Sequence, residues 1–479
     1  MSRFSELLKG YTDRSGVSVA ALSKRCGIDR TTLHKIISGE RRPPNEDFVV
    51  NLCQILMLSA TERDTFLEQY EISLVGDDLY RRRRNVKAMI EKLSEVGEKE
   101  YSALKSPFAI GDLPKNGVTN LYLEKHELFR RLYSANVEAF ENKSIVRIIA
   151  QPDDDFVDFM RYAFGYYKGS EIRHIFCLDN STGPGGANDY NLELFPRVCE
   201  LSAMYGNYRP MFYYDRVESH INESSLLPVL AVSDNFMFRA PCDVQSGIIS
   251  RNQIAVDYSV SQFDKLEKKC YPLIVRADDI SGMLGNGRDY HDYLYTIDVQ
   301  PSFILLATEV GVQNNMNLSQ EQKNILLERM KFVQQRYAGR EYSNIFTENG
   351  LIYFMKTGVI SELPERVYNI VPPERRLYAL RKMIECSEKG VYDFRLIDGD
   401  CAPKNNLRIN IGEEGTVHFV MRLRTGLVFL AVSEHSMRIA VEDYVTSLIE
   451  SGKIYSRERS VSIMKRILSA AERELSGSP

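Results

Sequence analysis

Apolar residues near the N-terminus recur every three or four positions, in short segments separated by glycine, proline and residues that cap helices. This spacing predicts five helices between residues 3 and 72, because positions three and four apart share one face of a helix. The apolar positions of these helices are Phe4, Leu7, Leu8 and Tyr11; Val19 and Leu22; Leu33, Ile36 and Ile37; Phe48, Val49, Leu52, Ile55 and Leu56; and Phe66, Leu67 and Tyr70. Together they supply enough apolar surface for a small independent domain.

The third predicted helix, residues 30–38, has two chemically different sides. Asp29 can cap its first turn by accepting a hydrogen bond from the amide of Thr31 or Thr32, and Gly39 ends the helix. One side is apolar, whereas the opposite side and the segment that follows are polar and basic. The positions that we expect to be exposed are Arg30, Thr31, His34 and Lys35 on the helix and Glu40, Arg41, Arg42, Pro43 and Pro44 after it. A helix that enters the major groove of DNA needs this combination of faces.

One further helix is predicted over residues 77–97, followed by a loop over residues 98–120 that is rich in proline and glycine. The apolar stripe of this helix is Val86, Met89, Ile90, Leu93 and Val96. Four consecutive basic residues, Arg81 to Arg84, cannot all lie on one face. We interpret the segment as a solvated linker helix; extra phosphate contact or a dimer helix is the alternative.

From about residue 121 the pattern alternates between strands and helices, which is typical of an α/β region with a parallel core. Strands are predicted at 144–151, 173–180, 208–217, 227–238, 247–258, 295–308 and 350–360, with three more in 407–433. Helices are predicted at 121–142, 153–167, 191–206, 260–270, 319–337, 373–389, 438–451 and 457–475.

Two internal similarities suggest that the α/β region contains two related lobes. LAVSDNFM at 230–237 is matched by LAVSEHSM at 430–437, and IAVDYSVSQF at 254–263 by IAVEDYVTSL at 439–448. Chance similarity between apolar segments is the alternative. The expected parts are an all-α domain over 1–75, a linker over 76–117, lobe 1 over 118–275 and lobe 2 over 276–479.

Charge is distributed unevenly along this chain of 479 residues. Residues 1–42 carry nine Lys and Arg against four Asp and Glu, a net charge of +5, whereas residues 43–78 carry one against eight. Because the whole chain has a net charge of −4, contact with a polyanion must come from the local basic face.

The eight cysteines show no zinc-site spacing, no signal peptide is evident and no apolar run approaches membrane-spanning length. We therefore expect a cytoplasmic protein without membrane contact.

The N-terminal region resembles the Cro/cI-like (XRE) helix-turn-helix family, a five-helix DNA-binding module. The residues that carry the resemblance are Leu22-Ser23, Gly27-Ile28, Thr31-Thr32-Leu33, Ile36, Ser38-Gly39, Arg41, Arg42 and Pro43. The resemblance implies that Arg30, Thr31, His34 and Lys35 contact base edges and that Thr32, Ser38, Arg41 and Arg42 contact phosphate. This chain departs from the family at Val19, where Gln is frequent, and at Ile37, where Glu is frequent. A helix-turn-helix used only for protein contacts is the alternative.

Other candidate chemistry is weaker. The glycine-rich segments 181–189 and 282–292 are ligand-contacting loops or surface turns, and Asp153 to Asp155 open a helix more plausibly than they bind Mg²⁺. The isolated histidines His174, His220, His418 and His435 have no partner in a recognisable catalytic motif. By element order the α/β region faintly resembles phospholipase-D-like folds, but their H-x-K-x-x-x-x-D motif is absent. The resemblance therefore implies an inactive sensor domain rather than an enzyme.

The leading hypothesis is a sequence-specific transcription regulator, such as a repressor, that binds double-stranded DNA as a homodimer without metal or cofactor. Its C-terminal region would sense an unidentified small-molecule or peptide effector, or oligomerise. The alternative is an enzyme-like effector that acts on a nucleotide or phosphoester and is targeted by the DNA-binding domain. A protein-interaction scaffold is the third possibility.

Overall fold

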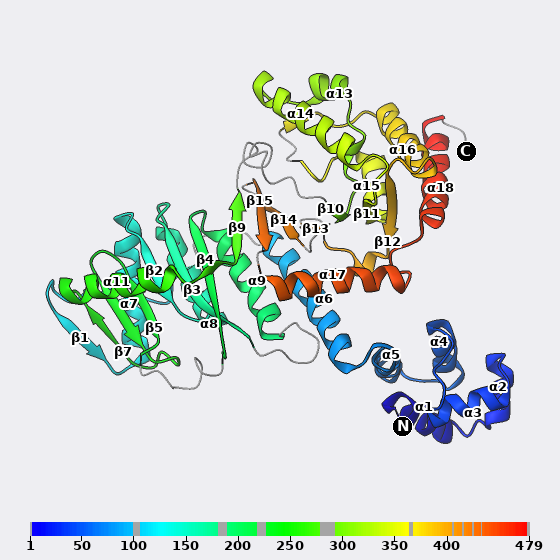
Figure 1. Cartoon of the computed structure of the whole chain (residues 1–479), viewed down its shortest axis with the longest axis horizontal. Helices are drawn as coiled ribbons and strands as arrows, with labels where there is room; N and C mark the ends of the chain where they lie inside the picture. Colours follow the sequence, from blue (N-terminus) through cyan, green and yellow to red (C-terminus); the bar gives the residue numbers. More distant parts are fainter. Residues whose placement is uncertain are drawn as a thin grey trace. The chain divides into compact units, whose positions relative to one another are not determined.

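The computed structural model describes residues 2–98, 106–180, 189–217, 227–277, 293–363, 367–404, 407–413, 416–423, 426–432 and 434–476. The chain divides into two compact units, Met1–Asn85 and Val86–Pro479 (Figure 1). An all-α unit is thus followed by a large α/β unit, which confirms the predicted fold class. The finer domain limits drawn from the sequence remain predictions.

The N-terminal unit contains the five predicted helices. They are α1 (Arg3–Ser15), α2 (Val19–Cys26), α3 (Arg30–Ser38), α4 (Glu46–Ile55) and α5 (Ala60–Val75). Polar side chains fix where the later helices begin: Asn45 accepts from the amide of Phe48 at 2.8 Å, and Ser59 forms a capping box with Glu62. Phe4 of α1 stacks on Phe66 of α5 with ring centroids 4.6 Å apart, which holds the first and last helices of the bundle together.

Helix α6 (Asp77–Glu98) crosses the boundary between the two units. Its apolar stripe is buried in the core of the α/β unit; the five members are Val86, Met89, Ile90, Leu93 and Val96, none more than 6% exposed. In addition, the hydroxyl of Ser94 on the same helix accepts from the amide of Lys404 at 3.3 Å. The interpretation of this helix as solvated is therefore wrong for its C-terminal half.

Lobe 1 is built on an eight-stranded mixed sheet in the order β1-β7-β6-β5-β2-β3-β4-β8. The strands are β1 (Thr119–Tyr122), β2 (Val146–Ile149), β3 (Ile172–Asp179), β4 (Tyr208–Asp215), β5 (Val229–Val232), β6 (Met237–Ala240), β7 (Gly247–Ser250) and β8 (Tyr271–Pro272). The helices are α7 (Lys125–Glu141), α8 (Asp154–Ala163), α9 (Asp189–Met204) and α11 (Gln253–Glu267). Helix α11 packs on β2, β5 and β6, where Val256 and Phe263 join a small core with Leu230 and Val232.

Lobe 2 is built on a seven-stranded mixed sheet in the order β12-β11-β10-β13-β14-β15-β9. The strands are β9 (Ile274–Ala277), β10 (Tyr293–Ile297), β11 (Ser343–Thr347), β12 (Asp393–Ile397), β13 (Leu407–Gly412), β14 (Val417–Leu423) and β15 (Gly426–Val432). The helices are α13 (Glu309–Asn315), α14 (Gln320–Tyr337), α15 (Glu348–Thr357), α16 (Pro373–Glu388), α17 (His435–Glu450) and α18 (Arg457–Ser476).

The two lobes share one strand order. In lobe 1, β2 pairs in parallel with β3 and β3 with β4, while β5, β6 and β7 continue antiparallel on the other side of β2. In lobe 2, β10, β11 and β12 are likewise parallel, and β13, β14 and β15 continue antiparallel beside β10. A helix follows the last of these strands in both lobes, α11 in one and α17 in the other.

This shared strand order shows which of the two internal sequence similarities joins equivalent elements of the two lobes. The segments 254–263 and 439–448 fall in α11 and α17, which occupy equivalent places in their lobes. The segments 230–237 and 430–437 begin in β5 and β15, and these two strands do not occupy equivalent places. β5 is the direct neighbour of β2, whereas β13 and β14 lie between β15 and β10, the strand of lobe 2 that corresponds to β2. Only the helical similarity therefore agrees with a relation between the lobes.

Three predicted strands contain helix. The segment 247–258 is a strand only as far as Ser250, because Asn252 then caps α11 by accepting from the amides of Ile254 and Ala255. In the segment 295–308, β10 ends at Ile297 and residues 303–305 form a 3₁₀ turn. The segment 350–360 lies largely in α15. Short apolar runs do not separate strand from buried helix, which explains these errors.

Candidate nucleic-acid interface

The sequence of residues 18–39 folds into a helix-turn-helix because each helix end has its own capping residue. Ser18 caps α2 by accepting from the amide of Ala21 at 3.2 Å, and Asp29 caps α3 by accepting from the amide of Thr32 at 2.8 Å. Gly27 and Gly39 end the two helices with φ of 69° and 81°, a region that favours glycine. The capping and the ends predicted for α3 are thus confirmed.

Helix α3 is held by its apolar side. Leu33 and Ile36 are 0% and 1% exposed and belong to the core that α1, α2, α4 and α5 share. The opposite side carries Arg30, Thr31, His34 and Lys35, all of which are exposed. Within the described part of the chain, none of these four side chains has a hydrogen-bond or ion-pair partner. The helix therefore presents a basic, hydrogen-bonding surface to whatever lies outside the unit.

Thr32 has a different position from its neighbours. Its side chain is half-buried, and its hydroxyl and amide both bond to the carboxylate of Asp29, so that the pKa of Asp29 lies below its ordinary value. The Arg41 guanidinium lies 3.4 Å from the same hydroxyl and donates to it. Arg41 and Thr32 thus lie together at the N-terminal end of α3, where the positive end of the helix dipole also favours an anion.

Ser38 and Arg42, the other two expected phosphate contacts, already have partners in the N-terminal unit. The Ser38 hydroxyl lies 3.2 Å from the carbonyl oxygen of Lys35 and 3.0 Å from a carboxylate oxygen of Glu40. Arg42 is exposed and donates from Nη1 to the carbonyl oxygen of Leu74 at 3.4 Å, in the last turn of α5. Of the two, Arg42 keeps more of its donors available, since one guanidinium carries five N–H groups.

The two positions that depart from the XRE pattern are partly buried. Val19 and Ile37 both pack against the core of the N-terminal unit. An apolar side chain in that place stabilises the bundle but offers no hydrogen bond to a base or phosphate. Neither Val19 nor Ile37 can therefore supply the polar contact that Gln or Glu offers at that place in the family pattern.

The arginine run at the start of α6 is not one basic face. Arg81 pairs with Asp78 at 2.8 Å, Arg84 pairs with Glu68 at 3.3 Å, and Arg82 is only 8% exposed. These carboxylates offset much of the positive charge. The run is therefore not a single uncompensated basic face.

Of the other sequence candidates, the segments 181–189 and 282–292 and His220 lie outside the described residues, apart from Asp189 at the start of α9. Asp153 caps α8 by accepting from the amide of Phe156 at 2.8 Å, and Asp154 pairs with Arg197 at 2.7 Å. In the described ranges no three His, Cys, Asp or Glu side chains gather in a way that could hold a metal ion. The acidic run is thus explained by the start of a helix.

Three of the isolated histidines considered as catalytic candidates, His174, His418 and His435, lie among the described residues. His174 is fully buried between the Tyr208 hydroxyl, 2.7 Å from Nδ1, and the carbonyl oxygen of Ala150, 3.0 Å from Nε2. Burial lowers the pKa of His174 to about 4, so the ring is neutral at physiological pH. His418 contacts the hydroxyl of Tyr293 at 2.6 Å, and His435 lies at the first turn of α17.

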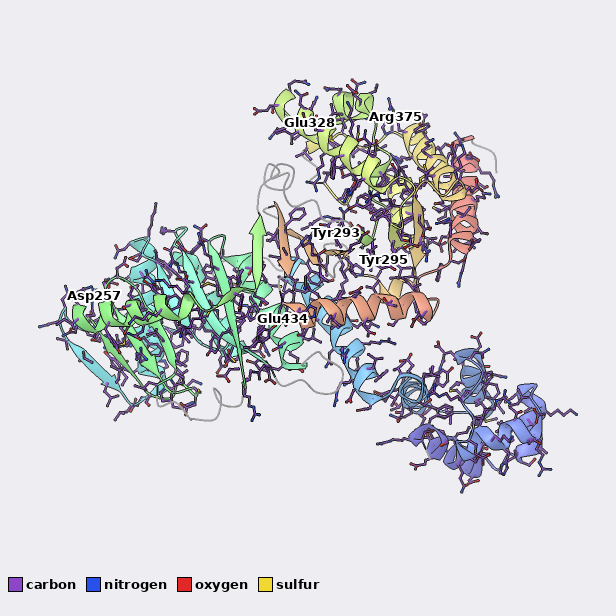
Figure 2. All side chains as sticks on the ribbon, viewed as in Figure 1. Asp257, Tyr293, Tyr295, Glu328, Arg375 and Glu434 are labelled. Carbon is purple, nitrogen blue, oxygen red and sulfur yellow. The ribbon has the colours of Figure 1, made fainter. Side chains whose placement is uncertain are left out.

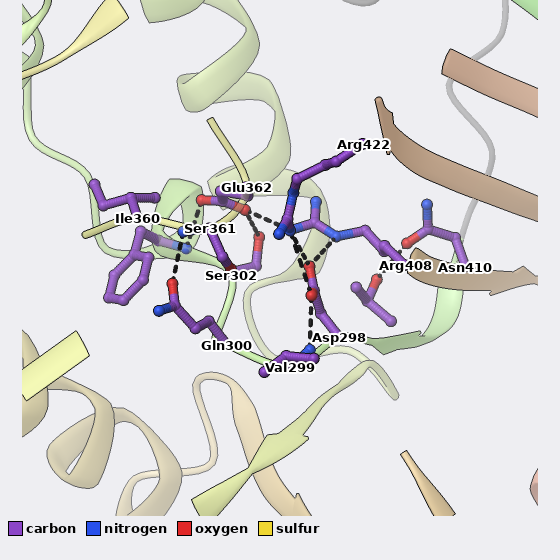
Figure 3. A network of polar contacts seen from close by, with 12 residues as sticks. Asp298, Val299, Gln300, Ser302, Ile360, Ser361, Glu362, Arg408, Asn410 and Arg422 are labelled. Carbon is purple, nitrogen blue, oxygen red and sulfur yellow. Dashed lines mark hydrogen bonds and ion pairs between the residues drawn. The ribbon is translucent and has the colours of Figure 1, made fainter. Parts of the chain in front are cut away.

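Sequence reasoning missed a buried ionic network in lobe 2, at the carboxyl end of β10 (Figure 3). Asp298 is 0% exposed and accepts from Arg408 Nε at 2.8 Å and from Arg422 Nη2 at 3.3 Å. Arg408 also donates to Glu362 at 2.7 Å, and Glu362 accepts from the Ser302 hydroxyl at 3.1 Å. These residues are far apart in the sequence and form no motif, so only the fold brings them together.

The network is electrically balanced, with two guanidinium groups against two carboxylates. Burial alone would lower the pKa of Arg408, but the charges of Asp298 and Glu362 outweigh it and raise that pKa. Burial lowers the pKa of Arg422, and the adjacent Arg408 charge adds to the effect against the attraction of Asp298. With no net charge left over, the network fits a structural role better than anion binding.

An open groove of about 530 Å³ runs along α11 in lobe 1, where Figure 2 labels Asp257. Its charged residues have mixed signs; they are Asp234, Asp257, Asp264, Lys265 and Lys268. Such a groove offers polar contacts but no concentrated charge.

No helix among the described residues is long and apolar enough to cross a membrane.

Comparison with known proteins identifies the N-terminal unit. Residues 3–66 match a family described as a helix-turn-helix domain, so the predicted helix-turn-helix is confirmed for this part of the chain. No curated protein matches the chain.

Solved structures with low similarity include an archaeal chromatin protein, TrmBL2, which is 9% identical with a TM-score of 0.21 over 56% of this chain and 94% of that chain. A phosphatidylserine synthase from Haemophilus influenzae is 11% identical with a TM-score of 0.21 over 80% and 99% of the two chains. A polyphosphate kinase from Porphyromonas gingivalis is 10% identical with a TM-score of 0.22 over 74% and 56%. At these TM-scores none of the three supports an argument about fold or activity.

Proposed function

We propose that this protein is a sequence-specific DNA-binding transcription regulator, in which α3 enters the major groove of double-stranded DNA. The observation that carries the proposal is the outer side of α3, where Arg30, Thr31, His34 and Lys35 are exposed without a partner within the described part of the chain. Two basic side chains and two hydrogen-bonding groups on one rigid helix face match the acceptors that base edges present in the major groove.

Each residue has a defined role in this proposal. Arg30 and Lys35 donate to the O6 and N7 acceptors of guanine, while Thr31 and His34 contact neighbouring base edges. Arg41 and Arg42 bind phosphate beside the helix, and Thr32 and Ser38 add shorter polar contacts. The net charge of +5 over residues 1–42 draws the domain to DNA, and the acidic residues 43–78 keep that attraction on one surface.

One helix of this length contacts too few base pairs for useful specificity, so the regulator acts as a homodimer on a repeated half-site. The α/β unit would hold the two copies together and respond to a small-molecule or peptide effector by favouring one conformation of the dimer. Whether the regulator represses or activates transcription depends on where its DNA-binding sites lie relative to promoters.

Selection from a pool of random DNA duplexes on the full chain tests the proposal. We expect enrichment of a motif that contains two copies of a half-site, and affinity for it that falls steeply as salt rises. An unenriched pool together with an affinity that does not change with salt would refute DNA binding by this surface.

A further inference from the structure

The first strand of lobe 1 is an open edge. β1 is the terminal strand of its sheet and pairs only with β7 among the described strands. Its apolar side chains are exposed: Leu121 is 63% exposed, and the flanking Val118 and Leu123 are 40% and 75% exposed. An unpaired edge with exposed apolar residues is a template for another strand.

Two other sheet edges are protected. At the opposite end of the same sheet, β8 contains Pro272 and leads directly into the next sheet. In lobe 2, the outer side of β12 is covered by the chain near residue 454: Asp398 donates its amide to Lys453, and Tyr455 donates its amide to Leu396, at 2.9 and 2.8 Å. As far as the described residues show, β1 has neither device.

The hydrogen bonds of β1 show which backbone groups face outward. Arg251, just after β7, donates its amide to the carbonyl oxygen of Val118 at 2.8 Å and accepts from the amide of Gly117 at 2.9 Å. Bonded and non-bonded pairs alternate along an antiparallel ladder, so Asn120 bonds to its partner on β7 and Leu121 does not. The N–H and C=O of Leu121, and those two residues away at Thr119 and Leu123, therefore point away from the sheet.

We propose that a second copy of this chain pairs with β1, antiparallel to it, across a two-fold axis that passes midway between the two Leu121 residues. In this register Leu121 faces its own copy and Thr119 faces Leu123 of the other chain, so all three outward-facing residues bond at once. A two-fold axis perpendicular to the sheet keeps equivalent faces of the two sheets on the same side, and the same residues of both copies form the interface, which is therefore isologous.

The composition of the edge favours a second copy as the occupant. Residues 119–123, TNLYL, carry no charge, so the axis brings no like charges together. Exposed Leu121 and Leu123 gain apolar contacts on the face that they share. The inference rests on the proposed function in one respect, since a regulator on a repeated half-site needs a dimer, and it deepens that function by assigning the dimer surface.

Sedimentation of the full chain without DNA tests the surface. We expect a dimer for the wild type, and for Leu121→Lys a dissociation constant raised by more than about tenfold, because two ammonium groups meet at the axis. Ile370→Lys is the matched control, since Ile370 is also 63% exposed but lies in lobe 2; it should dimerise like the wild type. A monomeric wild type, or a Leu121→Lys variant that still dimerises, would overturn the proposal.

Cysteine cross-linking tests the register and also guards against misfolding of the lysine variant. Oxidation should link Leu121→Cys into a covalent dimer, because paired residues on the axis lie within disulfide reach, whereas Ile370→Cys should give no more dimer than the wild type. Equal cross-linking of the two variants would contradict the register, and capture of a different protein by this edge would contradict the choice of occupant. A third measurement, binding of the Leu121→Lys variant to a duplex with one half-site, separates the dimer proposal from the proposed function. If DNA binding is correct and only the dimer surface is wrong, the variant binds this duplex. If the proposed DNA binding is itself wrong, the variant does not bind it.

Discussion

Arginines serve opposite purposes in the two units of this protein. Arg30 on α3 is exposed and has no partner in the described part of the chain, whereas Arg408 in lobe 2 is enclosed by Asp298 and Glu362. Both side chains carry the same charge and the same five donors. Their surroundings decide whether that charge is available to another molecule or is used within the fold.

The comparison shows which charges are candidates for function. A buried guanidinium must be neutralised by carboxylates or it destabilises the fold, so its partners explain its presence. An exposed and uncompensated guanidinium contributes little to stability, and a second basic residue on the same helix face strengthens the case for an external polyanion. By this criterion the basic side of α3 is the stronger functional candidate, and the network of lobe 2 is structural.

The largest expected effect is on stability and comes from the buried network. Replacing Arg408 with Met leaves Asp298 and Glu362 without their main partner, which should destabilise lobe 2 by about 3–5 kcal/mol. Thermal and denaturant unfolding of the full chain would measure this loss. Arg375→Met, at an exposed site of α16, is the control and should unfold like the wild type. Equal stability of the two variants would contradict the structural role of the network.

The next effect is on DNA affinity and comes from the exposed face. Replacing Arg30 and Lys35 together with Ala should weaken binding to the selected duplex by about 1–3 kcal/mol for each base that the variant no longer reads, without a change in unfolding temperature. Fluorescence anisotropy with a labelled duplex would measure it. The control removes two exposed basic residues from the α/β unit, Lys265→Ala with Arg375→Ala, and should keep wild-type affinity. Equal losses in both double variants would mean that only total charge matters.

A smaller effect separates phosphate binding from base recognition. Arg41→Gln or Arg42→Gln should weaken binding to every duplex alike and lower the slope of log affinity against log salt by about 0.9 for each phosphate that the variant no longer neutralises. Arg30→Ala should instead weaken the selected motif more than an unrelated duplex. Salt titrations on both duplexes would compare the three variants. A slope unchanged by either glutamine variant would remove that arginine from the phosphate-binding set.

The smallest effect is at acid pH and concerns the cap of α3. Because the pKa of Asp29 is lowered in the fold, its capping contribution is complete above the ordinary carboxyl pKa of about 4 and is lost as pH falls through the lower, folded value. The protection of the amides of residues 29–39 against hydrogen exchange, measured relative to the intrinsic rate at the same pH, should therefore fall in strong acid. Asp29→Asn keeps a good cap but does not titrate, so its exchange should be less sensitive to acid. The same sensitivity in both proteins would exclude Asp29 as the cause.

Local signals explain why the helix-turn-helix unit was predictable. Asp29, Gly27 and Gly39 act through bonds to residues only a few positions away, so the sequence alone located the ends of α3. The division of that helix into a buried and an exposed side follows from its periodicity, and burial of Leu33 and Ile36 confirms it. The roles assigned to the exposed residues remain predictions.

The α/β unit was less predictable because its decisive contacts are long-range. α15 was expected as a strand, yet Thr347 caps it, and Gly350 approaches the carbonyl oxygen of Val299 so closely that a side chain there would clash. The ionic network joins Asp298 to residues 408 and 422, and no local pattern marks such a pairing. α6 was interpreted as solvated because the sequence does not show what covers an apolar stripe.

The most direct test of the central claim is a parallel selection from random duplexes with the wild type and with the Arg30→Ala, Lys35→Ala double variant. If the outer side of α3 reads DNA, the wild type enriches a defined motif and the double variant loses preference at specific bases within it. Enrichment of the same motif by both proteins would contradict the account, because the sequence would then be recognised by some other surface.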